Sequence, residues 1–172
     1  TISAGSHTGA SSAIRQYGDN VDENDETIYI NASSVTNGVE DGVQTANIRI
    51  IDDDTVKLKW SVTGSDYDVN EAGSETRATT LLLDSQPNGN VVIDATVSDS
   101  SEFNITTGSQ VTFTPSNWFN GQNIVIQAID DNIDDDNVTV QLQIAVNTSS
   151  TTDTTGYASL GTKKKNFVAI DD

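Results

Sequence analysis

Three observations predict an all-β fold, built as an antiparallel sandwich of two sheets. Apolar and polar residues alternate over short segments such as "VTVQLQIAV" at 138–146, and no segment shows helical periodicity. Clusters of Gly, Asn, Ser and Pro, such as "QPNGN" at 86–90, separate these segments. Seven of them fit into about 115 residues, which is typical of an immunoglobulin-like β-sandwich.

The expected strands of this sandwich are identified by alternation or by enrichment in β-branched residues. They are 56–62, 78–84, 91–97, 110–114, 123–129, 138–146 and 166–170. Hydrophobic residues make up only 34% of the chain, so we expect a thin core between two sheets.

The chain also repeats its own pattern. "DNVDENDETIYI" at 19–30 matches "DNIDDDNVTVQL" at 131–142, since each is an acidic loop with one aliphatic residue followed by an alternating strand. Upstream of these blocks, residues 1–14 match residues 112–125. The offset is 111 in the upstream match and 112 in the acidic loop, which indicates an internal repeat.

A third match, between "IIDDD" at 50–54 and "AIDD" at 169–172, has an offset of 119 because the loop 147–162 carries extra residues. The sequence therefore predicts tandem repeats, with a complete copy at 55–172 and the C-terminal part of another at 1–54. The partial copy is expected to supply only its last three strands, at 11–17, 26–32 and 44–51. Its other strands would come from preceding sequence or from another chain.

Composition excludes several classes of function. Eight Lys and Arg stand against 26 Asp and Glu, a net charge of -18, which argues against partners such as nucleic acid or an anionic membrane surface. The chain has no cysteine for a disulfide, a thiol nucleophile or a Cys-based zinc site, and no apolar run long enough to span a membrane. It has neither an initiator Met nor a signal peptide, so we expect a mature product or a fragment.

Most acidic residues of the complete copy are predicted to gather at one end of the sandwich. Successive antiparallel strands run in opposite directions, so every second connection and the end of the last strand share an end. The acids in those connections are Asp66, Asp68, Glu71, Glu75, Asp99, Glu102, Asp130, Asp131, Asp134, Asp135, Asp136, Asp171 and Asp172.

Such a concentration of negative charge predicts a cation site. Two like charges about 4 Å apart repel by about 1 kcal/mol in water and by several times more near a protein surface. His7 is the only histidine, so transition metals lack their usual ligands, and Ca²⁺ accepts more carboxylates than Mg²⁺ does. The alternative is that each Asp-rich loop is simply a solvated turn.

The blocks "DNVDENDETIYI" and "IRIIDDD", together with "VNEAG" and "VTFTPSNW", resemble the Calx-beta repeat. This calcium-binding, immunoglobulin-like domain is known from sodium–calcium exchangers and from large bacterial surface proteins. The resemblance covers the complete copy at 55–172 and the last three strands at 1–54. It implies an extracellular location on a bacterial cell surface.

The resemblance also implies the metal ligands. In the complete copy they are Glu71, Glu102, Asp130, Asp131, Asp134, Asp135, Asp136, Asp171 and Asp172. In the partial copy they are Asp19, Asp22, Glu23, Asp25, Glu26, Asp52, Asp53 and Asp54. Two positions depart from the family pattern: Glu102-Phe103 replaces an Asp-Tyr pair, and the second acidic loop has Asn137-Val138 where the first has Asp25-Glu26.

The expected function is that of a calcium-binding structural repeat in a large extracellular surface protein. Calcium would rigidify the joints between domains and so form a stalk or spacer for adhesion or surface assembly, with neighbouring repeats as partners. The alternatives are a calcium-sensing regulatory domain and a module that binds a glycan or another cell-surface partner. We expect no enzyme, because the sequence has no Ser/His or Cys/His set and the acids crowd one end without a predicted cleft.

Overall fold

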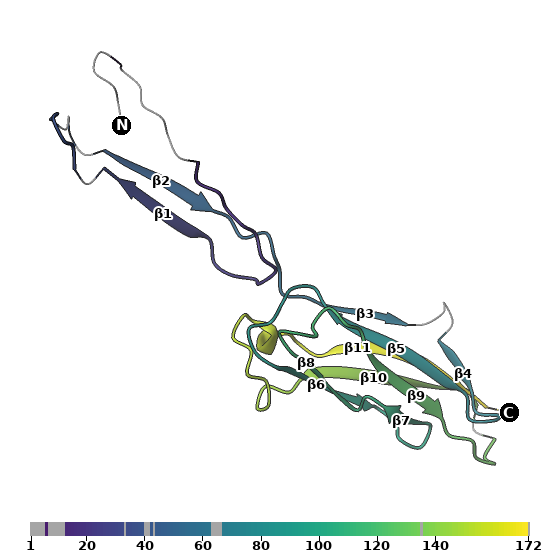
Figure 1. The fold of residues 1–172 in the computed structure, drawn as a ribbon. Helices are drawn as coiled ribbons and strands as arrows, with labels where there is room; N and C mark the ends of the chain where they lie inside the picture. Colours follow the sequence, from purple (N-terminus) through teal and green to yellow (C-terminus); the bar gives the residue numbers. More distant parts are fainter. Residues whose placement is uncertain are drawn as a thin grey trace. The chain divides into compact units, whose positions relative to one another are not determined.

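The computed structural model describes residues 6, 13–32, 34–39, 42, 44–62, 67–134 and 136–171 (Figure 1). The chain divides into two compact units, Thr1–Asp19 with Asp25–Ile51 (unit 1) and Asn20–Asn24 with Asp52–Asp172 (unit 2). In the part that is described, regular structure consists of β-strands and one 3-10 turn at Tyr157–Ser159. No helix there is long and apolar enough to cross a membrane.

Unit 2 is a β-sandwich, as the sequence predicts. One sheet has the strand order β4 (Asp68–Asn70), β11 (Lys163–Ile170), β10 (Val138–Val146), β6 (Val91–Val97), β8 (Gln110–Phe113). The other has the order β3 (Leu58–Val62), β5 (Thr76–Leu83), β9 (Gln122–Ala128), β7 (Phe103–Thr107). Every pairing is antiparallel except that of β4 with β11, which is parallel.

The core lies between the two sheets and follows the alternation of the sequence. In β10, Val140, Leu142 and Ile144 are buried, and the residues between them face outward. Ile124 and Ile126 of β9 are buried in the same cluster from the other sheet. A small number of aliphatic and aromatic side chains thus closes the sandwich, which is how a chain with 34% hydrophobic residues can build it.

The prediction of seven strands was wrong in number, because unit 2 has nine among its described residues. β4 is an added strand of three residues, and β7 was not expected. β7 and β8 are one extended stretch that leaves one sheet for the other at Gly108, whose φ is +75°. A Cβ at this glycine would collide with the carbonyl oxygen of Asn123, so the crossing requires Gly.

Unit 1 contains an antiparallel hairpin of β1 (Glu26–Asn31) and β2 (Thr45–Ile50). Both strands were predicted. The strand predicted at 11–17 is absent over residues 13–17, which are exposed and outside any strand, while residues 11 and 12 lie outside the described part. In unit 2 the matching strand β9 pairs with β5 on one side and β7 on the other, and no such partners flank residues 13–17 in the described part of unit 1.

Candidate metal centre

One end of unit 2 collects four acidic segments, as strand direction predicts, and we call it the acidic end. The segments are the turn between β4 and β5, the connection from β6 to β7, the loop from β9 to β10, and the end of β11. Backbone hydrogen bonds join them. The Glu71 N–H donates to the Ile170 carbonyl at 3.1 Å, and the Ile129 N–H donates to the Glu102 carbonyl at 2.8 Å.

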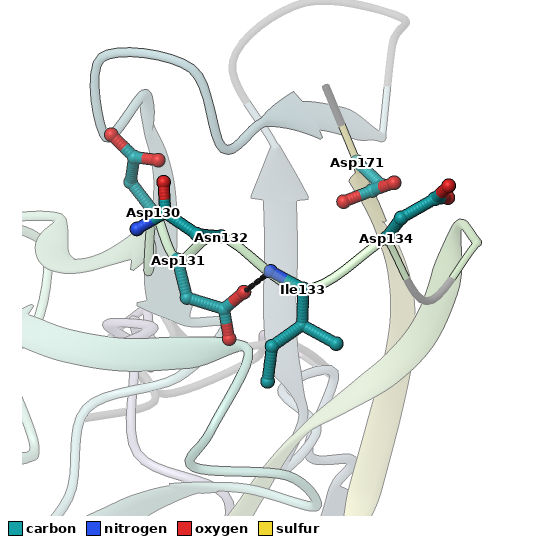
Figure 2. Close-up of a pocket in the computed structure, with 6 residues that line it drawn as sticks. All are labelled: Asp130, Asp131, Asn132, Ile133, Asp134 and Asp171. Carbon is teal, nitrogen blue, oxygen red and sulfur yellow. Dashed lines mark hydrogen bonds between the residues drawn. The ribbon is translucent and has the colours of Figure 1, made fainter.

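The loop from β9 to β10 forms a hollow of about 280 Å³ at this end. It is lined by Asp130, Asp131, Asn132, Ile133, Asp134 and Asp171 (Figure 2). The carboxylates of Asp134 and Asp171 extend to the same side of the loop, whereas Asp130 points away on the other side. Two elements far apart in sequence, the acidic loop and the end of β11, therefore contribute carboxylates to one place.

Hydrogen bonds within the loop hold this shape. The Asp131 carboxylate accepts the N–H of Ile133 at 2.7 Å, which makes a local turn. The Asp171 N–H donates to the Asn137 side-chain oxygen at 3.2 Å and ties the end of β11 to the loop. Asn132 and Asn137 were not among the predicted site residues, although "DDNID" and "DDDNV" place each of them beside the aspartates.

Other predicted ligands of the complete copy lie at the acidic end but do not line the hollow. Glu71 is only 4% exposed, and Glu102 offers its backbone carbonyl to Ile129. Asp136 is exposed and has a φ of +65°. Asp135 and Asp172 lie outside the described residues.

Two further acids at this end are engaged by protein donors. The pKa of Glu75 is lowered by the backbone N–H of Asn70, by Arg77 at 2.5 Å and by the Asn70 side chain. The pKa of Asp99 is lowered by the hydroxyl and then by the backbone N–H of Ser101. These two carboxylates are held by protein donors and do not line the hollow.

The first acidic segment, Asn20–Asn24, belongs to unit 2, where it exchanges hydrogen bonds with residues 52–56. The Asp22 carboxylate accepts the Val56 N–H at 3.2 Å, and the Asp52 carboxylate accepts the Glu23 N–H at 3.3 Å. The Asp52 carboxylate also accepts the Asp54 N–H at 3.5 Å. These contacts stabilise the start of the domain.

The remaining acids of the partial copy have other surroundings. In unit 1, Asp25 forms an ion pair with Arg49 across the hairpin, and Glu26 begins β1. Asp19 precedes the first acidic segment, and Asp53 is exposed beside Asp52. Across the described residues of both units, no three Asp, Glu or His side chains are arranged to hold a metal ion.

The donor set of the hollow nonetheless fits a hard cation. Its polar lining consists of four carboxylates and one carboxamide, and no nitrogen or sulfur ligand is present among the six lining residues. Ca²⁺ takes six to eight oxygen ligands on flexible loops and completes its shell with water, whereas Zn²⁺ and Cu²⁺ prefer His and Cys. Asp134 and Asp171, whose carboxylates extend to the same side of the loop, are the lining residues best placed to hold such an ion.

Comparison with known proteins gives only distant likenesses. No family model matches the sequence, and no curated protein matches it. Among solved structures, a FixG-related protein from Vibrio parahaemolyticus is 11% identical, with a TM-score of 0.42 over 69% of this chain and 98% of that one.

Two further structures have lower TM-scores. The apo-form Calx CBD1 domain is 12% identical, with a TM-score of 0.40 over 67% of this chain and 97% of that chain. Domains 4 and 5 of the S-layer protein SbsC are 11% identical, with a TM-score of 0.37 over 75% of this chain and 62% of that chain. The assignment of a β-sandwich therefore depends on the sheets of this chain and not on these likenesses.

Proposed function

We propose that unit 2 is a calcium-binding structural domain of an extracellular surface protein, in which the ion holds together the acidic end of the sandwich. One observation carries the proposal: carboxylates from the β9–β10 loop and from the end of β11 line the same hollow. A cation there would bridge the β9–β10 loop and the end of β11, adding to the hydrogen bond from the Asp171 N–H to the Asn137 side chain and to the pairing of Val138 with Ala169.

Electrostatics supports this role. The six lining residues include four acids and no basic residue, and Arg77 at the same end is occupied by Glu75 and by the Asp68 carbonyl. Carboxylates that extend to the same side of one hollow, as those of Asp134 and Asp171 do, repel each other, and a divalent cation removes that repulsion. Calcium is thus expected to stabilise the domain.

The extracellular location rests on the chemistry of the site and on composition. Open calcium sites on extracellular modules bind with a Kd of about 0.1–1 mM, which suits the calcium concentration outside cells. A chain with a net charge of -18 and no cysteine is compatible with that environment. Domains of this kind, with neighbouring repeats as partners, would serve as a stalk or spacer, and we assign the acids no catalytic role.

Titration calorimetry of the whole chain tests the proposal. We expect Ca²⁺ to bind in the sub-millimolar to millimolar range and Mg²⁺ more weakly, with a rise in Tm of about 4 °C at ten times the Kd. The double variant Asp134→Asn and Asp171→Asn should abolish both effects.

The matched control is Asp84→Asn, which removes the same kind of charge from an acid that pairs with Lys59 at the end of β5. This variant should keep the calcium response. If millimolar Ca²⁺ produces neither heat nor a change in Tm in the unaltered chain, the proposed function is wrong.

A further inference from the structure

The hairpin of unit 1 carries an apolar row on one face. Ile28 and Ile30 of β1 lie opposite Ile48 and Ala46 of β2, and Ile50 extends the row. Ile28, Ile30 and Ile48 are 38%, 37% and 37% exposed. A two-stranded hairpin is marginally stable alone in water, so an apolar face of this kind calls for a covering layer.

The hairpin β10–β11 of unit 2 has the same register once the repeat offsets are applied. Ile28 shifted by 112 is Val140, and Ile48 shifted by 119 is Phe167. Ile28 and Ile48 are cross-strand partners in unit 1, and Val140 and Phe167 are cross-strand partners in unit 2. The second hairpin therefore shows what lies against such a row in a folded sandwich.

In unit 2 the equivalent row is completely covered. Val140, Leu142, Phe167 and Ala169 are 1%, 0%, 1% and 0% exposed, and they belong to one core cluster with side chains of β3, β5, β7 and β9. β10 is also paired along its other edge with β6. The cover is a second β-sheet together with one further strand of the same sheet.

The residues that precede the hairpin also indicate that part of the sandwich is missing around unit 1. Ile14 shifted by the upstream offset of 111 is Val125, in the middle of β9 and half-buried, while Ile14 itself is 54% exposed. Tyr17 is 86% exposed. Residues 13–17 thus carry the sequence pattern of a central strand but lie outside any strand.

We propose that the row formed by Ile28, Ile30, Ile48 and Ile50 is a docking surface for a β-sheet segment with the strand pattern of residues 58–113. This segment would supply the equivalents of β3 to β8, and residues 13–17 would then form a strand between them, as β9 does. The inference does not depend on calcium.

A second copy of the hairpin is a poorer occupant. Two hairpins placed face to face would leave the strand-like residues 13–17 without partners. They would also bring together two chains that each carry a net charge of -18. A segment with the strand pattern of the repeat would cover the apolar row, pair along the edge of β1 and supply strand partners for residues 13–17.

A fusion tests the proposal with the whole chain. A second copy of residues 55–111 is joined directly ahead of Thr1, because Thr1 matches Thr112 in the repeat. Hydrogen exchange of the amides at 27–30 and 46–49 should slow by about tenfold or more compared with the unfused chain. In the fused chain, Ile28→Thr should remove this protection. Tyr29→Thr should leave it in place, because Tyr29 is on the other face of β1 and is 69% exposed.

Two results would overturn the inference. One is a fused chain in which unit 2 is folded but the hairpin exchanges as fast as before, whether or not the added strands fold. The other is an unfused chain that sediments as a dimer and becomes monomeric with Ile28→Thr, which would make a second copy the occupant.

Discussion

Asp171 donates its backbone N–H to the side-chain oxygen of Asn137 at 3.2 Å, so the last described residue of the chain is fixed to the loop that opens β10. This bond positions the Asp171 carboxylate beside the hollow lined by Asp134. Asn137 does not itself line the hollow. It acts on the candidate metal centre by positioning the carboxylate of Asp171.

Asn137→Ala is expected to weaken calcium binding and to lower the free energy of unfolding by about 1 kcal/mol, the usual net value of one hydrogen bond. Calorimetry and denaturant unfolding measure the two effects. Asn88→Ala is the matched control, because Asn88 also holds a loop, through its bonds with Thr154 at 2.7 and 2.9 Å. The control should lose comparable stability but keep its affinity for calcium, and equal affinities in both variants would contradict a positioning role for Asn137.

Tyr157→Phe is expected to lower the free energy of unfolding by about 1–3 kcal/mol, because it leaves buried polar atoms without partners. The Tyr157 hydroxyl is fully buried, donates to the Ser85 carbonyl at 2.8 Å and accepts the Ser85 N–H at 3.1 Å. Urea unfolding at pH 7 checks the loss. Tyr67→Phe, at a residue that is 37% exposed, should change stability much less.

The same tyrosine gives a prediction for alkaline pH. Burial raises the pKa of Tyr157, so the folded state retains its proton at a pH where the unfolded chain has lost it. The stability from this group is complete below the unfolded pKa of about 10 and is lost as pH rises toward the folded value. The fall in unfolding free energy above about pH 10 should therefore be shallower in Tyr157→Phe than in the unaltered chain, and parallel curves would contradict this.

The sequence predicts those parts of the molecule that follow from local pattern and strand direction. Alternation identifies β10 and β6, and counting strand directions brings the 130–136 loop and Asp171 to the same end. β4 and β7 were missed because one has three residues and the other, "FNITT", alternates only weakly. The direction of a carboxylate depends on the turn that carries it. The sequence therefore could not show that Asp134 extends to the same side as Asp171 whereas Asp130 points away.

The crossing from β7 to β8 at Gly108 also depends on a residue that is distant in sequence, Asn123. Gly108→Ala forces a Cβ toward the carbonyl oxygen of Asn123 in β9 and imposes a positive φ on an L-residue. The positive φ alone costs about 1–2 kcal/mol, and the collision adds to it, so a loss of more than about 2 kcal/mol in unfolding free energy is expected. Denaturant unfolding gives the value.

Gly161→Ala is the control for this change, because a Cβ there meets nothing within 4 Å. Removing a glycine from a site that tolerates alanine leaves stability unchanged or raises it by about 0.4–1 kcal/mol, through the lower entropy of the unfolded chain. Similar stabilities for the two variants would mean that the strand can change sheets without a glycine at 108. A large loss confined to Gly108→Ala would establish that this residue lets one strand serve both layers of the sandwich.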